Sequence, residues 1–288
     1  YPVEGRSKPV EAALLLDGAQ PFDGCGSLKF GRVWKNSADT FRTDAAGNQL
    51  RPTQVECPGW LDADAADRDV SGRVYEFYLT AGEHRLSLAA NEEAFRLASL
   101  TLYNPEPVQA YAQAGPSAEQ AAATPAYART WEAETAPRKS DATLYPSTDR
   151  TSPLTTTYDP VKVQMNTIGG STWAAAGQWI EWDIEVPADG YYTLVLRARQ
   201  NVMRGMKSYR RLTIDGAVPY TECEALAFRY DSKWQVVELG DGTQPYYFHL
   251  TAGRHTIRLE VLHAEIDNSA AVLQDALTGH NTLYRRVL

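Results

Sequence analysis

The chain has 288 residues, with 28 lysines and arginines against 36 aspartates and glutamates, so its formal net charge at neutral pH is −8. This length suits two domains of ordinary size. The basic residues are scattered along the chain, which argues against nucleic acid as a partner, and no apolar run approaches the roughly 20 residues that insertion into a membrane requires.

An internal repeat organises the sequence. LLLDGAQPF at 14–22 matches LTIDGAVPY at 212–220, and YEFYLTAGEHRLSL at 75–88 matches YYFHLTAGRHTIRL at 246–259. In both copies apolar and polar residues alternate between turn residues, which predicts half-buried strands joined by tight Asp-Gly turns. The first copy carries an insertion at about 35–72. Because residue 1 corresponds to residue 199, we expect the first copy to begin mid-domain, its first strands either lost or supplied by another polypeptide.

The second copy contains additional strand patterns. In QWIEWDIEV, at 178–186, one face of the predicted strand is apolar: Ile180, Trp182, Ile184, Val186. Trp182 is therefore expected in the core, whereas Trp179 lies on the opposite face. The Asp189-Gly190 turn ends this strand, and residues 191–199 begin another.

These elements predict an all-β chain of two tandem jelly-roll β-sandwiches. We place the first sandwich at 1–104, a partly helical, proline-containing linker at 105–129, the second sandwich at 130–267, and a C-terminal helix or extension at 268–288. Three cysteines are too few for a disulfide framework and lack zinc-ligand spacing, so we expect buried free thiols.

Three further segments indicate a family: WEAE at 131–134, GQWIEW at 177–182 and VPADGYYTLVLRAR at 186–199. They resemble the galactose-binding-like β-sandwich modules, which include carbohydrate-binding module families six and thirty-five. With NTIGGSTW at 166–173 and RQNVMRGMKSYRRLTIDG at 199–216, the chain is similar to the tandem sandwich region of extracellular solute-binding proteins of sugar ABC transporters in Gram-positive bacteria. The resemblance implies an extracellular, cell-surface-associated protein with further domains in the same polypeptide.

The resemblance also implies a structural calcium ion in the second sandwich. Glu132 and Glu134 match the acidic strand that commonly supplies its carboxylates, and Asp267 is the candidate partner acid near the last strand. Calcium requires several oxygen ligands, so a pair of carboxylates is insufficient. The alternative is an exposed strand that carries two acidic residues.

A sugar site needs an aromatic platform flanked by groups that hydrogen-bond hydroxyls. The best such set is in the second copy, around the Gly169-Gly170 turn: Asn166, Trp173, Trp179, Asn201, Arg204. The two tryptophans could instead pack in loops. The first copy has its own loop candidates: Trp34, Arg42, Asn48, Arg51, Trp60.

No hydrolase, metalloprotease or phosphate-loop motif occurs, and His84 and His255 occupy equivalent positions, which favours structural roles. We therefore expect no catalysis. The first hypothesis is a non-catalytic carbohydrate-binding region of a larger extracellular protein linked to glycan capture or uptake, with a glycan or oligosaccharide as its partner. The alternative is a structural spacer or protein-docking pair of sandwiches with no ligand of its own, which burial of both Trp173 and Trp179 would favour.

Overall fold

The computed structural model describes residues 8–68, 72–91, 94–153, 155 and 157–263. The described part is all-β, as the alternating sequence patterns predict, with short helical segments between strands. Within these ranges no helix is long and apolar enough to cross a membrane. The predicted C-terminal helix at 268–288 and the candidate calcium ligand Asp267 lie outside the described residues.

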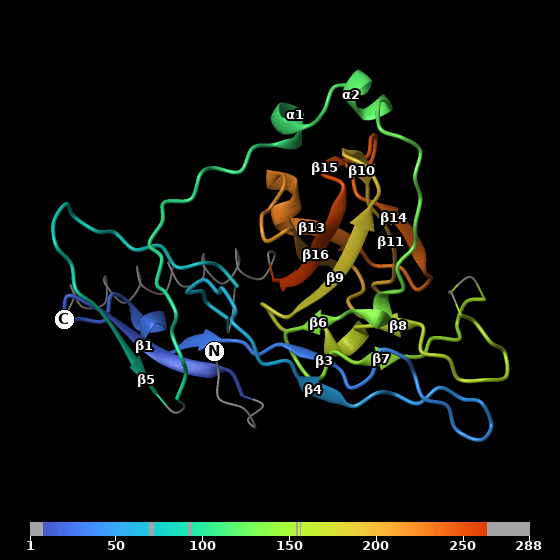
Figure 1. The fold of residues 1–288 in the computed structure, drawn as a ribbon, viewed down its shortest axis with the longest axis horizontal. Coiled ribbons are helices and arrows are strands. Elements are labelled where there is room, and N and C mark those ends of the chain that lie inside the picture. Colours follow the sequence, from blue (N-terminus) through green and yellow to red (C-terminus); the bar gives the residue numbers. More distant parts are fainter. Residues whose placement is uncertain (1–7, 69–71, 92–93, 154, 156, 264–288) are drawn as a thin grey trace, which may run out of the picture.

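The first half of the chain forms a three-stranded antiparallel sheet in the order β2-β1-β5 (Figure 1). Its strands are β1 (Val10–Leu16), β2 (Leu28–Phe30) and β5 (Leu86–Ala90). Leu14 of β1 and Leu28 of β2 pack with Cys25, which lies in the 3-10 turn η1 (Asp23–Gly26). This half therefore has a small core of its own.

The second half is a two-layer sandwich. One layer is a seven-stranded sheet, in the order β13 (Leu226–Arg229), β12 (Lys207–Ile214), β16 (Gly253–Leu262), β9 (Trp179–Val186), β6 (Arg138–Lys139), β3 (Trp34–Asn36), β4 (Gln54–Glu56). The other layer consists of strand pairs: β10 (Gly190–Thr193) with β15 (Tyr247–Leu250), and β11 (Val195–Ala198) with β14 (Gln235–Glu238). A further pair joins β7 (Pro146–Ser147) to β8 (Thr167–Ile168).

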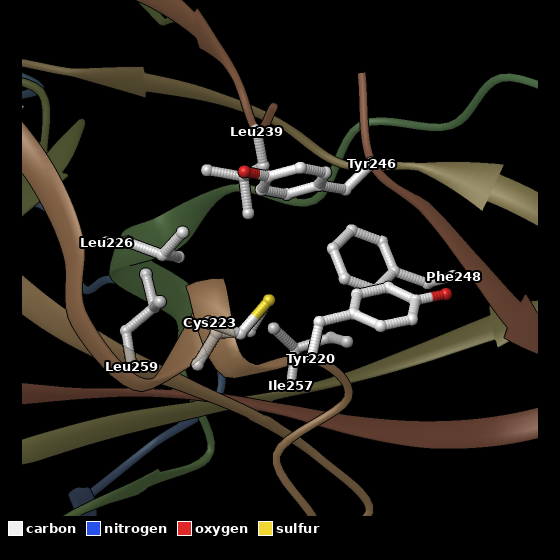
Figure 2. Packing of buried hydrophobic residues seen from close by; sticks show 9 residues of the cluster. Tyr220, Cys223, Leu226, Leu239, Tyr246, Phe248, Ile257 and Leu259 are labelled. Atoms are coloured by element: carbon white, nitrogen blue, oxygen red, sulfur yellow. The ribbon is translucent and has the colours of Figure 1, made fainter. Parts of the chain in front are cut away.

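The two layers meet in an apolar core (Figure 2). Ile257 and Leu259 project from β16 of the large sheet, and Phe248 faces them from β15. Cys223, from the 3-10 turn η4 (Thr221–Ala225), fills the space between them. Trp182 and Ile184 of β9 pack against the same cluster, as their alternation predicts. The cysteines are free thiols, and Cys25 and Cys223 are buried.

The Asp-Gly turns of the two halves adopt the same conformation and make the same contacts. Asp17 and Asp215 have a φ of 52°, and the glycine that follows each also has a positive φ, as a two-residue hairpin turn requires. One carboxylate oxygen of each aspartate accepts a hydrogen bond from a backbone amide. The donor is Arg85 in the first half and Thr256 in the second. Its other oxygen contacts Nδ1 of a histidine, at 2.7 Å for His84 and 2.6 Å for His255. Both histidines thus fix a turn, as predicted.

The insertion of the first copy pairs with the second half. The hairpin β3–β4, which the sequence places in the sandwich at 1–104, extends the large sheet through β6 (Figure 1). Lys139 of β6 is fully buried, and its Nζ donates to Asn36 Oδ1 at 2.7 Å and to Gln54 Oε1 at 2.6 Å. The predicted domain boundary at residue 104 therefore does not separate the three-stranded sheet from the seven-stranded one, because β3 and β4 precede it and belong to the latter.

Lys139 is expected to make stability depend on pH. Burial lowers the pKa of its amine from 10.5 to about 8. Because the unfolded chain then binds more protons between pH 8 and 10.5, the contribution of Lys139 to stability rises across this window, by on the order of 3 kcal/mol. Urea titrations of the wild type and of Lys139→Met at pH 7.5 and 10 measure this contribution. The difference in the free energy of unfolding between the two proteins should change with pH. A difference that is independent of pH would contradict the prediction.

The linker predicted at 105–129 contains two short helices, α1 (Tyr111–Ala114) and α2 (Ala118–Ala122). The Tyr111 ring lies edge-on to the ring of Tyr220, with centroids 5.0 Å apart. Tyr111 also packs against the core cluster of the second half. The linker is therefore held against the second sandwich by an aromatic contact.

Candidate functional site

Trp179, one of the two predicted sugar platforms, is covered by a charged side chain. Trp179 is only 6% exposed. The Arg258 guanidinium lies 4.0 Å from the centre of the indole ring, a cation–π contact. Arg258 is in turn held by the buried Glu181 carboxylate, at 2.7 Å. The solvent-facing side predicted for Trp179 is thus occupied by this protein's own residues.

Trp173, the other predicted platform, is half-buried and packs against two core clusters. Its indole N–H donates to the Gln178 carbonyl at 3.2 Å. The Arg210 guanidinium lies 4.4 Å from the ring centre and donates to the Trp173 carbonyl. These contacts hold both tryptophans in place, with Trp179 buried and Trp173 half-buried.

The remaining predicted residues lie near the loop that follows β11. Asn166 is buried, and its side-chain amide exchanges two hydrogen bonds with the backbone of Asp149, at 2.8 and 2.9 Å. Asn201 and Arg204 are exposed on the loop 199–206. Asn166 therefore shapes the site indirectly, whereas Asn201 and Arg204 are accessible to a ligand.

The loop 199–206 is ordered by Gln200. The Gln200 Oε1 accepts from the amides of Val202 and Met203 at 3.0 Å, and its Nε2 donates to the carbonyls of Met203 and Met206, also at 3.0 Å. With the loop closed on this side chain, three apolar side chains remain at its surface: Val202, Met203, Met206. The loop thus presents apolar and polar groups together in a fixed conformation.

A charged cluster lies at the base of this loop; we call Asp149, Thr151, Arg199 and Trp234 the Arg199 cluster. Arg199 donates to Asp149 Oδ2 at 2.5 Å and to Thr151 Oγ1 at 2.7 Å, and its guanidinium lies 5.0 Å from the centre of the Trp234 ring. Burial raises the pKa of Asp149, but hydrogen bonds from Thr151 and the charge of Arg199 outweigh it and hold that pKa below its usual value. The carboxylate therefore stays ionised and orients Arg199.

The loop 199–206 thus begins at a fixed guanidinium that lies over an indole, and it carries two exposed polar side chains. Guanidinium and amide groups hydrogen-bond to hydroxyls, while the face of an indole and thioether groups contact C–H surfaces. The sequence prediction missed Trp234 and Asp149 because they are distant along the chain from Arg199. The one available signal was that Trp34 in the first copy falls near Trp234 in the repeat alignment.

The candidate calcium ligands lie in a turn, not in the predicted strand. Residues Ala133–Thr135 form the 3-10 turn η2, and Glu132 precedes it. Glu134 is 3% exposed, and burial raises the pKa of its carboxyl to about 7, with a further contribution from the charge of Glu132. Its Oε2 has no hydrogen-bond partner in the described part of the chain. Within that same part no three His, Cys, Asp or Glu side chains converge.

The first-copy candidates do not gather at one place. Trp34 is in β3, opposite Lys139. Asn48 binds the Val163 amide through Oδ1, at 2.9 Å, and so joins the insertion to the second half. The remaining three candidates are dispersed. Arg42 is exposed, the Arg51 guanidinium lies over the Tyr145 ring, and Trp60 is 63% exposed.

The chain matches no protein-family model and no curated protein. Several solved structures are similar to parts of this chain, among them the following three. A Paenibacillus sp. cycloisomaltooligosaccharide glucanotransferase complexed with cycloisomaltoheptaose is 26% identical with a TM-score of 0.31, over 45% of this chain and 15% of that one. A Podospora anserina GH26-CBM35 beta-(1,4)-mannanase is 15% identical with a TM-score of 0.31, over 46% and 24%. A family 35 carbohydrate binding module from an environmental isolate is 18% identical with a TM-score of 0.28, over 41% and 72%.

Proposed function

We propose that this chain is a non-catalytic carbohydrate-binding region of a larger extracellular protein that captures or takes up glycans. The observation that carries the proposal is the Arg199 cluster beneath the loop 199–206, where Asp149 and Thr151 orient Arg199 beside Trp234. Asn201 and Arg204 at the rim supply further hydrogen-bonding groups. The sequence resemblance supports two copies of one module, a cell-surface location and an association with sugar transport.

A spacer or protein-docking role is the second candidate. The burial of Trp179 and the packing of Trp173 favour it, because these were the two aromatic surfaces on which the sequence placed a sugar. The two candidates differ in whether the loop 199–206 binds a ligand. A direct binding measurement therefore decides between them.

A glycan-array screen of the whole chain, followed by calorimetry on any positive glycan, tests carbohydrate binding. We expect dissociation constants of about micromolar to millimolar, because a shallow, hydrated site gains little over water. Asn201→Ala and Arg204→Ala should each weaken binding about tenfold without loss of stability, since both side chains are exposed.

Trp60→Ala is the matched control, because Trp60 is exposed but remote from the Arg199 cluster along the chain; binding should survive it. An array without any binding at millimolar sugar would reject the carbohydrate proposal and support the spacer role. Binding that is retained in both loop variants and lost in Trp60→Ala would move the site to the first half.

We also propose that Glu134 and Glu132 contribute to a structural calcium site, with Asp267 as the third acid. The support is the buried Oε2 of Glu134, which has no hydrogen-bond partner among the described residues, because a buried carboxylate is costly without a hydrogen bond or a cation. Calcium should raise the melting temperature of the wild type, and more at pH 8 than at pH 6, since ligation requires the deprotonated Glu134. Calorimetric melting with calcium and with a chelator measures this.

Glu134→Gln should abolish the calcium effect on melting. Glu185→Gln, which changes an exposed acid of the same half, should leave it intact. A calcium effect of equal size in the wild type and in Glu134→Gln would show that the ion binds elsewhere.

A further inference from the structure

Positive charge is concentrated at the end of the second sandwich that carries the loop 199–206. The chain as a whole has a formal net charge of −8, yet residues 199–207 contain three basic residues and no acidic one. Residues 229–234 add two basic residues against one acid. Four of these five basic side chains are exposed, and we call them the basic patch: Arg204, Lys207, Arg229, Lys233.

Backbone contacts hold the two segments of the basic patch side by side. Lys207 of β12 lies directly opposite Arg229 of β13 in an antiparallel pair. The amide of Asp231 donates to the Gln200 carbonyl at 2.8 Å, and the Asp231 carboxylate accepts from the amide of Lys233 at 2.9 Å. The basic patch therefore adjoins the Arg199 cluster, which lies at the base of the same loop.

The pairing of Lys207 with Arg229 works against the stability of the fold. Side chains directly opposite each other in an antiparallel ladder have Cβ atoms about 4.5–5.5 Å apart, and like charges in such a pair are destabilising. At the other end of the same sheet the charges are opposite, because Arg254 lies opposite Glu185. An anion bound between Lys207 and Arg229 would remove the repulsion and accept charge-assisted hydrogen bonds from both side chains.

We propose that the basic patch binds a polyanionic glycan, which carries carboxylate or sulfate groups on neighbouring sugar units. This inference rests on the carbohydrate-binding function proposed above and names the class of glycan. One anionic group lies between Lys207 and Arg229, where the planar guanidinium can bind two oxygens of the anion through parallel N–H bonds. The ammonium group of Lys207 supplies a second charge at the same point.

The loop 199–206 supplies the contacts to the sugar rings. Val202 is 68% exposed and Met203 is 36% exposed, so both offer apolar surface to the C–H groups of a sugar. Arg204 on the same loop and Lys233 on the neighbouring turn attract further anionic groups along the chain of sugars. A glycan with several charges therefore gains more at this surface than a neutral glycan of the same length.

Three polymers with one glucose backbone separate the charge from the sugar: dextran, carboxymethyl-dextran and dextran sulfate. Each is titrated into the whole chain by calorimetry at about 0.1 M and about 1 M salt. At the lower salt concentration, at least one charged polymer should bind about tenfold more tightly than dextran. This advantage should disappear at the higher concentration, because the screening length falls from about 10 Å to about 3 Å.

The same titrations distinguish the failure of this inference from the failure of the proposed function. Equal binding of dextran and of both charged polymers, or binding of neutral glycans alone on the array, would overturn the polyanion inference and leave carbohydrate binding intact. No binding of any polymer or array glycan would reject both. Binding of polyphosphate as tight as that of the charged dextrans would show recognition of charge without sugar, and would overturn the glycan assignment.

A matched pair of variants locates the site. Arg229→Gln should weaken binding of the charged polymers about tenfold without lowering the melting temperature, because it also removes a like-charge pair. Arg254→Gln makes the same change at an exposed arginine at the other end of the sheet, and should leave binding unchanged. Equal binding by both variants, or a lower melting temperature in Arg229→Gln, would contradict the proposal.

Discussion

Leu212→Ala is expected to lower the free energy of unfolding by about 3–5 kcal/mol, the range for a cavity that cannot collapse. Leu212 is fully buried in the core between the two layers, together with Ile257 and Leu259. Its neighbours belong to paired strands of a seven-stranded sheet, so they relax little into the space that the substitution leaves. Urea denaturation followed by circular dichroism measures the loss.

Leu14→Ala is the matched comparison, because Leu14 occupies the equivalent position of the first copy. Leu14 is 6% exposed and belongs to a cluster of three buried residues, so its neighbours can relax more. We expect a loss of about 2 kcal/mol, at the lower end for such substitutions. Equal losses for the two variants would indicate that the first half is packed as completely as the second.

Glu181→Gln is expected to cost about 3 kcal/mol, because it leaves two arginines without their shared charge partner. Glu181 is buried, and its carboxylate binds Arg138 on one side and Arg258 on the other. Both guanidinium groups remain partly exposed, which limits the loss by allowing water to solvate them. Asp183→Asn is the control: Asp183 also binds Arg138 but is 31% exposed, so its loss should stay below about 1 kcal/mol.

Glu181→Gln should also change the fluorescence of Trp179. Arg258 lies over the Trp179 ring, so displacement of its guanidinium alters the surroundings of that indole. Double-mutant cycles with Arg258→Met would measure the coupling between the two residues directly. A coupling near zero would mean that Arg258 is held by its contact with Trp179 and not by Glu181.

Much of the fold follows from local sequence patterns. The period of two in residues 179–186 correctly predicts that Ile180 and Val186 are buried, because successive side chains of a strand point to opposite faces. The repeated Asp-Gly pairs predict two equal turns, because few residues adopt the positive φ that such turns need. These features depend on neighbours within a few positions along the chain.

Only the tertiary structure decided the contacts between residues that are distant in sequence. The alternation places Trp179 on the outer face of β9, but Arg258 from β16 covers it there. Asn36 and Gln54 lie in the first copy, yet they bind Lys139 and join β3 and β4 to the sheet of the second. The sequence by itself determined the strands, the turns and the repeat, since these follow from backbone preferences and side-chain period. The candidate site and the completion of each sheet depend on strand pairing across the chain, which local patterns do not encode.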